Sequence, residues 1–183
     1  MIYIHSVFWL LVILFAVIGT FRGASKELLV TSALILFLFI NFLLADNLFD
    51  SILSMEDTVM GAKVLFWIRS VLVVGLTLAG YQIPDSASKF KTRISGSDRV
   101  DKITGFLMGG INGYLIWGSL WSFMLQAQER APEFLKFFIP MDPSAILGEG
   151  PTILDFLPPD RLQGGWLYAV VIFMFVFILV IVI

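Results

Sequence analysis

The sequence contains no cysteine and few charged residues, and each shortage excludes a class of protein. Without cysteine the chain can form neither a disulfide nor a thiolate metal site. Its single histidine excludes a multi-histidine metal or haem site. Lysine and arginine number 12 against 14 acidic residues, so the net charge is −2 and no basic surface for nucleic acid is expected.

Most of the remaining residues are apolar: 58% of the 183 residues are hydrophobic, and the mean hydropathy is +0.93. Only 14% are charged, whereas a soluble domain has about a quarter. In lipid, only helices and closed barrels satisfy every backbone polar group. Barrel strands alternate apolar and polar residues, but the apolar runs here continue for roughly twenty residues. The composition therefore predicts an all-α membrane protein.

Five segments are long and apolar enough to cross about 30 Å of hydrocarbon. We predict transmembrane helices over Ile2–Thr20, Leu28–Ala45, Met60–Ile83, Gly105–Leu125 and Trp166–Ile183. The first has neither the charged start nor the small-residue cleavage site of a signal peptide, so we interpret it as a retained helix.

These helices divide the chain into a four-helix transmembrane core over residues 1–125, a loop over 126–163 and a fifth transmembrane helix over 164–183. The loop holds six of the seven prolines. Proline fixes φ and removes a hydrogen-bond donor, so no uninterrupted helix can pass through the loop. Its apolar clusters favour a position in the headgroup interface, on the extracytoplasmic side.

Lysine and arginine are unevenly distributed among the loops, and this asymmetry predicts orientation. The first and third loops together hold seven, and the second and fourth hold three. We therefore expect the loops at Phe21–Glu27 and Asp85–Lys102 to face the cytosol. The acidic loop at Asp46–Val59 and the N-terminus are then outside.

Three glycines, Gly105, Gly109 and Gly113, recur every four residues and form one stripe along a predicted helix. Such a stripe lets a second helix approach closely, and close packing is what holds helices together in lipid. The partner is either a helix of the same bundle, which we prefer, or a second protein.

Arg69, Asn41 and Asn112 are the polar residues within the predicted spans that bear on function. Arg69 faces a water-filled path, pairs with a carboxylate of a partner, or extends outward to the headgroups. We prefer the last, because Lys63 lies nearer the same surface. The asparagines are expected to form interhelical hydrogen bonds.

No motif of a common enzyme class is present: the chain has no phosphate-binding glycine loop, nucleophile elbow or helical His-Glu-x-x-His. We therefore expect no enzyme and predict no catalytic, cofactor-binding or metal-binding residue. Glu27 begins a helix, where an acid favours the helix dipole.

Two stretches combine glycines and charged residues in a recognisable spacing. Residues 18–28 contain Gly-x-x-Arg-Gly-x-x-(Arg/Lys)-Glu, with Arg22, Gly23 and Glu27. Residues 95–113 contain Ser-Gly-x-Asp-Arg, with Asp98 and Arg99, and lead into the glycine stripe. Together they resemble the colicin V production protein family of bacterial inner-membrane proteins, over about residues 1–125.

The second stretch departs from the family pattern in two ways. Asp101 and Lys102 stand at the family's distance from Gly105, whereas Asp98 and Arg99 match its residue types three positions earlier. The family also tends to carry an arginine within the glycine stripe, where this chain has Asn112.

The resemblance implies a multi-pass protein of the bacterial inner membrane with a role in toxin production or export and in envelope integrity. It implies four helices, so the fifth lies beyond the matched part, and it brings no catalytic residue. Asp98 and Arg99 either cap the fourth helix and pair with the loop at Arg22–Glu27, or the two loops are independent and solvated.

Three functional hypotheses follow. The first is a non-enzymatic envelope protein of the colicin V production type. The second is an accessory or assembly subunit of a larger membrane complex, respiratory or photosynthetic, because the fifth helix has no polar residue after it. The third is a small channel or transporter, suggested by Arg69 and the asparagines. The expected partners are the lipid bilayer and other membrane subunits or a second copy of the chain.

Overall fold

The computed structural model describes residues 2–44, 58–82, 97–136, 138–139, 156–161 and 164–182. These residues include the short Phe21–Glu27 turn but only parts of the other predicted loops, so the sides assigned to the loops stay predictions. Within the described ranges the chain is helical apart from one pair of two-residue strands, so the prediction of an all-α fold is confirmed.

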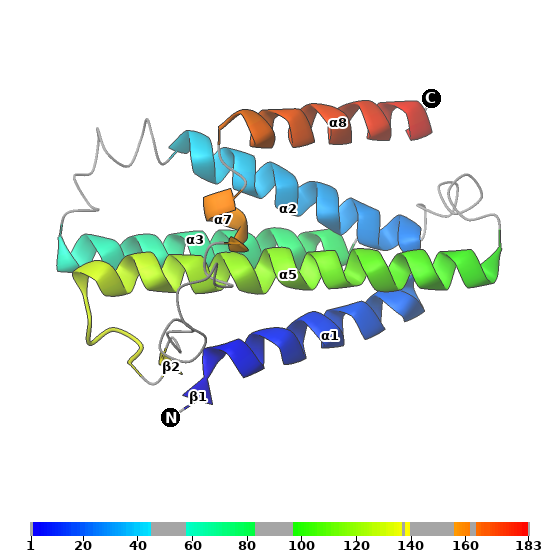
Figure 1. The fold of residues 1–183 in the computed structure, drawn as a ribbon. Coiled ribbons are helices and arrows are strands. Elements are labelled where there is room, and N and C mark those ends of the chain that lie inside the picture. Colours follow the sequence, from blue (N-terminus) through cyan, green and yellow to red (C-terminus); the bar gives the residue numbers. More distant parts are fainter. Residues whose placement is uncertain are drawn as a thin grey trace.

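Five long helices account for most of the described chain, and each coincides with one predicted apolar segment. They are α1 (Ile4–Arg22), α2 (Ala24–Leu44), α3 (Val59–Tyr81), α5 (Asp98–Arg130) and α8 (Gly165–Val182). Consecutive long helices run in opposite directions (Figure 1). The short α7 (Pro158–Arg161) precedes α8, and the strands β1 (Ile2–Tyr3) and β2 (Phe138–Ile139) pair in parallel.

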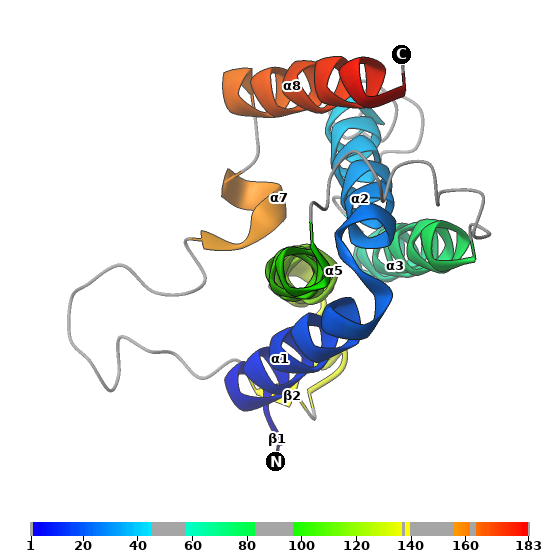
Figure 2. The same cartoon turned by 90° about the vertical axis from the view of Figure 1, so that its right-hand side faces the viewer.

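The central helix is α5, which contacts α1, α2, α3 and α7. Figure 2, a view close to the axis of α5, shows α1 on one side of it and α2 and α3 on the other. The last helix, α8, lies against α2. Residues of α1, α2, α3 and α5 therefore form the core, in which Phe8, Phe37, Val73 and Phe123 are almost fully buried.

The central helix is longer than the apolar segment that predicted it, because it begins at Asp98 rather than Gly105 and ends at Arg130 rather than Leu125. The hydroxyl of Ser97 caps its start by accepting a hydrogen bond from the Val100 backbone N–H at 3.4 Å. Acids in the first turn and a base in the last complement the helix dipole. The assignment of residues 98–102 to a loop was therefore wrong, since hydropathy marks the apolar length of a helix and not its caps.

The outer faces of the helices are also apolar. Leu10 on α1, Val71 on α3 and Phe175 on α8 each expose about two thirds of their surface. Among the described helices, Ala24–Leu43 and Val59–Tyr81 are long and apolar enough to cross a membrane. Two further apolar helical stretches, Ser6–Arg22 and Gly165–Val176, are shorter.

Candidate functional site

The glycine stripe packs inside the bundle, against α1. A Cβ atom on Gly105 would overlap the carbonyl oxygen of Gly19, and one on Gly109 would overlap that of Phe15. At Gly113 an added Cβ would lie 2.9 Å from the Cβ of Phe15. The two backbones thus approach so closely that no side chain fits between them, as in other small-residue helix contacts. The stripe serves the intramolecular packing that we preferred.

Close approach of α1 to α5 brings the turn between α1 and α2 against the start of α5. Gly23 makes this turn with φ +84°, a conformation that glycine adopts at little cost. A Cβ on Gly23 would lie 2.5 Å from Oδ2 of Asp101, so the position is also too tight for a side chain. The other carboxylate oxygen of Asp101 accepts a hydrogen bond from the Ala24 backbone N–H at 3.0 Å. Asp101 therefore caps the start of α2 from a neighbouring helix.

Glu27 lies one turn into α2 and is completely buried. Nε of Arg22 donates to its Oε1 at 2.8 Å, forming a salt bridge. Its Oε2 accepts hydrogen bonds from Nδ2 of Asn112 at 2.8 Å and from the Tyr81 hydroxyl at 3.1 Å. Three donors from three other helices thus converge on one carboxylate.

Asn112 is the second fully buried member of this group. Its Nδ2 also donates to the backbone carbonyl of Glu27 at 3.0 Å. The Thr31 hydroxyl lies one turn further along α2 and donates to Oδ1 of Asn112 at 2.7 Å. Asn112 makes the interhelical hydrogen bonds that its position within a span predicts.

Arg22 completes the arrangement from the end of α1. Its guanidinium carbon lies 4.1 Å from the centroid of the Tyr81 ring, which is within cation–π range. A cation at a helix C-terminus also interacts favourably with the helix dipole. We call Arg22, Glu27, Thr31, Tyr81 and Asn112 the polar cluster. It joins the four helices of the core at one end of the bundle.

The two family-like stretches meet at this cluster, but not through Asp98 and Arg99, the pairing that the sequence had left open. Arg22, Gly23, Glu27 and Asp101 come together, as described above. The side chains of Asp98, Arg99 and Lys102 are exposed on the first two turns of α5. The pairing of the two motifs therefore runs through Asp101, the acid at the family's distance from the glycine stripe.

Arg69 is buried, with 6% of its surface exposed, so the expectation that it extends outward was wrong. Its Nη1 donates to Oε1 of Gln126 at 2.8 Å, and its guanidinium lies 5.7 Å from the Phe123 ring centroid. The reason is the length of α5, because the helix continues past Leu125 and brings Gln126 opposite α3.

Asn41, the third polar residue singled out, is partly buried near the end of α2. Fourteen residues separate it from Glu27 on the same helix, which is about 21 Å at 1.5 Å per residue. It therefore does not belong to the polar cluster, and its interhelical hydrogen bond stays a prediction.

Sequence reasoning missed Tyr81, Thr31 and Gln126 as contacts and understated Glu27. An acid in the first turn of a helix has a sufficient local explanation in the dipole, so nothing pointed to its burial. A tyrosine at the end of a span is similarly typical of the membrane interface. The sequence did contain one signal, a polar residue within each of two apolar helices. Asn112 on α5 and Glu27 at the start of α2 were candidates to bind each other.

The chemistry open to the cluster is limited by its own hydrogen bonds. Both oxygens of Glu27 are occupied by donors from the protein, and the carboxylate is enclosed. Within the described parts of the chain, His, Cys, Asp and Glu side chains do not gather in a group of three or more that could hold a metal ion. The arrangement suits a lock between helices, because a buried carboxylate is stable only when charge and hydrogen bonds compensate it.

Fold and cluster together define a small bundle of apolar helices that is locked at one end by a buried ion pair. The profile of the family described as Colicin V production protein matches residues 4–136. The chain belongs to this family, which confirms the resemblance found in the two motifs. The matched part runs from the start of α1 to just beyond the end of α5. Neither a curated protein nor a solved structure matches the chain.

Proposed function

We propose that this chain is a non-enzymatic, multi-pass protein of the bacterial inner membrane, with a role in toxin production, which its family name indicates, or in envelope integrity. In this proposal all five long helices cross the bilayer, and the protein acts by packing and by recruiting other proteins. The observation that carries it is the apolar outer surface of the alternating helices.

Large apolar side chains cover the outside of α1, α3 and α8, including Leu10, Val71 and Ile172, each more than 60% exposed. Water-soluble proteins rarely expose contiguous apolar patches of this extent. In a bilayer this exposure has no free-energy cost, because the acyl chains of the lipid solvate apolar side chains well. Helices with fully paired backbones are also what a bilayer requires.

The charges around the polar cluster support the proposed orientation. Arg99 and Lys102 are exposed at the start of α5, at the end of the bundle where Asp101 caps the start of α2. With Arg22 and Lys26 they bring four bases to this end of the bundle, beside the acids Glu27, Asp98 and Asp101. Basic residues near helix ends favour the cytosolic side, where the headgroups are anionic. The N-terminus is then outside and α8 ends in the cytosol.

The cluster also supports a structural rather than a catalytic role. A general base or nucleophile needs access to its substrate, and Glu27 is enclosed by its own donors. Arg69 and Asn112 suggested a channel or transporter, but both are buried and hydrogen-bonded to the protein. The subunit hypothesis stays an untested prediction.

Single cysteines test the orientation, because the chain has none of its own. Lys102→Cys and Glu133→Cys place thiols at exposed positions near opposite ends of α5. We expect a membrane-impermeant maleimide to label position 133 in intact cells and position 102 only after the membrane is opened. The reverse pattern would invert the topology, and labelling of both in intact cells would contradict a membrane-spanning arrangement.

The cellular role requires a gene deletion complemented with variants. We expect the deletion strain to lose colicin V secretion or to become sensitive to detergent, and wild-type protein to restore it. Glu27→Ala should restore less at equal expression, whereas Glu133→Ala on the exposed segment after α5 should restore fully. A deletion strain that matches its parent in both assays would contradict the proposed role.

A further inference from the structure

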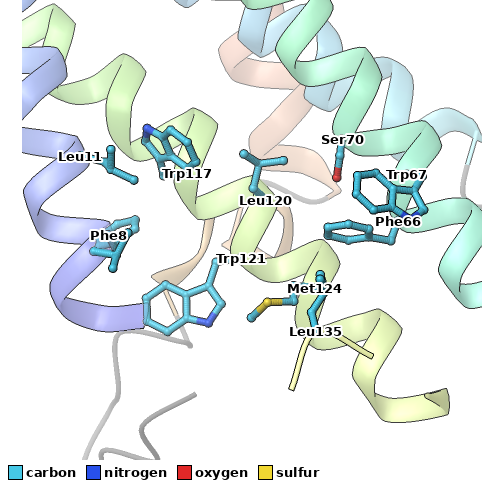
Figure 3. A pocket seen from close by; sticks show the side chains of 11 residues that line it. Phe8, Leu11, Phe66, Trp67, Ser70, Trp117, Leu120, Trp121, Met124 and Leu135 are labelled. Carbon is cyan, nitrogen blue, oxygen red and sulfur yellow. The ribbon is translucent and has the colours of Figure 1, made fainter. Parts of the chain in front are cut away.

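A cavity of about 270 Å³ lies between α1, α3 and α5, away from the polar cluster (Figure 3). Its wall is almost entirely apolar. The lining residues are Val7, Phe8 and Leu11 of α1, Phe66, Trp67 and Ser70 of α3, Trp117, Leu120, Trp121 and Met124 of α5, and Leu135 after it.

The splay of α1 from α5 produces this cavity. Gly105, Gly109 and Gly113 let α1 touch α5, but the same every-fourth-residue row continues with Trp117 and Trp121. Two tryptophans in place of two glycines hold the helices apart, and Figure 1 shows α1 diverging from α5 toward its N-terminus. Large residues thus keep a space open that smaller ones would have closed.

Polar atoms in the cavity wall lack partners. The Ser70 hydroxyl and the indole nitrogens of Trp117 and Trp121 are buried, and none has a hydrogen-bond partner among the described residues. Ser70 is 7% exposed and Trp121 is 3% exposed. In Figure 3 the Ser70 oxygen points toward the Phe66 ring, and the Trp121 nitrogen lies on the side of its ring that faces Met124. Buried donors without acceptors are rare and costly, so a missing partner is indicated.

The kind of partner follows from the donors. An indole N–H can only donate, so the ligand must offer an acceptor. The apolar wall requires that the rest of the ligand be apolar. A carbonyl oxygen attached to a hydrocarbon chain meets both conditions.

Ser70 and Trp121 lie at the same level of the bundle, because the neighbouring Arg69 contacts Phe123 and Gln126. The centroid of the Trp121 ring lies 5.5 Å from that of the Phe8 ring. Phe8 is four residues after the first residue of α1, which is about 6 Å along the helix. If Arg22 marks one boundary of about 30 Å of hydrocarbon, the other falls near the start of α1. The donors therefore lie in the leaflet that contains the start of α1, nearer to the ester carbonyls of that leaflet than to those of the opposite one.

The entrance is also apolar. Trp67 lines the cavity and is more than half exposed, and Val71 beside it on α3 is two thirds exposed. On α1 the exposed neighbours are Leu10 and Leu14. An occupant that enters between α1 and α3 must come from an apolar medium, which for a bilayer-embedded bundle is lipid.

We propose that this cavity binds one acyl chain of a membrane phospholipid and that its ester carbonyl accepts hydrogen bonds from Trp121 and Ser70. The inference rests on the proposed membrane location. It goes beyond it by assigning a lipid site to residues outside the polar cluster.

An ester lipid and its ether analogue distinguish this proposal from simple solvation, because the ether has the same chains but no carbonyl. Purified protein is placed in nanodiscs with equal parts of the diester and diether phosphatidylcholines and examined by native mass spectrometry. One lost hydrogen bond corresponds to about a tenfold preference, so we expect the retained lipid to be ester by about that ratio.

Trp121→Phe keeps an aromatic ring and removes the donor, and Ser70→Ala removes the hydroxyl with little change in volume. Each should reduce the ester preference several-fold at an unchanged melting temperature, whereas Trp166→Phe on the outer face of α8 should not. Equal retention of ester and ether lipid by the wild type would overturn the proposal, as would an undiminished preference in both variants.

An isoprenoid quinone is the main alternative occupant, because it also joins a carbonyl oxygen to a hydrocarbon chain. Adding it to the nanodiscs tests this alternative. Replacement of the retained phospholipid by quinone at equal concentration would overturn the lipid assignment. A protein that fails to enter nanodiscs or liposomes would instead contradict the membrane location itself. The two failures are therefore distinguishable.

Discussion

The two ends of the bundle treat buried polar groups in opposite ways. At the end with the polar cluster, donors and acceptors from four helices satisfy one another, and the centre is closed. At the end with the cavity, two indole N–H groups and a hydroxyl lie in an apolar wall without partners among the described residues. Both ends are built on the same row of α5, which is glycine at one end and tryptophan at the other.

The size of the residues in this one row of α5 therefore determines how closely α1 packs at each end of the bundle. Where the row is small, α1 approaches α5 closely enough for Glu27 and Asn112 to be enclosed. Where it is large, the helices separate and leave room for a molecule that is not part of the chain. Substitutions at each end should therefore have different signatures, and four of them test the contrast in order of expected size.

Glu27→Ala should produce the largest effect. Removal of one member of a buried ion pair costs about 3–5 kcal/mol, and we expect about 3 because Arg22 is partly exposed. The free energy of unfolding in mixed micelles measures this. The exposed pair of Glu133 and Lys136 provides the control, and Glu133→Ala should change stability by less than about 0.5 kcal/mol. A small effect at Glu27 would show that the cluster does not lock the bundle.

Arg69→Gln tests the hydrogen bond between Arg69 and Gln126, near the cavity. The substitution removes a charged hydrogen bond to Gln126, for which about 1.5–3 kcal/mol is typical. Lys63→Gln, two turns away on the same helix, should have little effect. If instead Arg69→Gln left the melting temperature unchanged, Arg69 would be bound to headgroups and not to α5.

Gly109→Ala and Gly110→Ala change adjacent residues and should have opposite effects on the free energy of unfolding. A methyl group on Gly109 overlaps the Phe15 carbonyl, so we expect a loss of about 1–3 kcal/mol. On Gly110 it would make an ordinary contact, 3.6 Å from the Cβ of Ala16. There alanine should stabilise the helix by about 0.5–1 kcal/mol. Thermal unfolding of the two proteins in one detergent compares them directly, and equal effects would refute the close contact of α1 and α5.

Tyr81→Phe should have the smallest effect, because it removes one of three donors to Glu27 and leaves the ring over Arg22. The loss of one hydrogen bond corresponds to about 0.5–1.5 kcal/mol. Tyr168→Phe on α8 is the matched control and should be neutral. A double substitution with Asn112→Leu should cost more than the two single changes together, since Glu27 would then keep only Arg22.

The sequence predicted the helices well and their meeting points poorly. Hydropathy located all five long helices, because each contains a long apolar segment, although α5 extends beyond its segment at both ends. Glycine spacing indicated a close helix contact, and the two motifs identified the family. Contacts depend on helix rotation and offset, which no local pattern contains, so the sequence left open whether Asp98 and Arg99 pair with the first loop and did not identify Asp101.

Arg69 is a second case in which the sequence did not predict a contact between helices. Its surroundings in sequence are apolar on both sides, and an outward position near Lys63 was reasonable. Its true partner, Gln126, belongs to a turn of α5 that hydropathy had excluded. The error in the boundary of one helix therefore became an error in the environment of another.

The position of the ion pair in the chain has a consequence for biogenesis. Arg22 and Glu27 are five residues apart, so their charges can pair as soon as α1 and α2 have been synthesised. Tyr81 and Asn112 follow 54 and 85 residues after Glu27 and reach it only when α3 and α5 exist. If the proposed membrane location is right, we expect the first hairpin to enter the bilayer with the Glu27 carboxylate already paired with Arg22. The later helices convert that provisional pairing into the final enclosure.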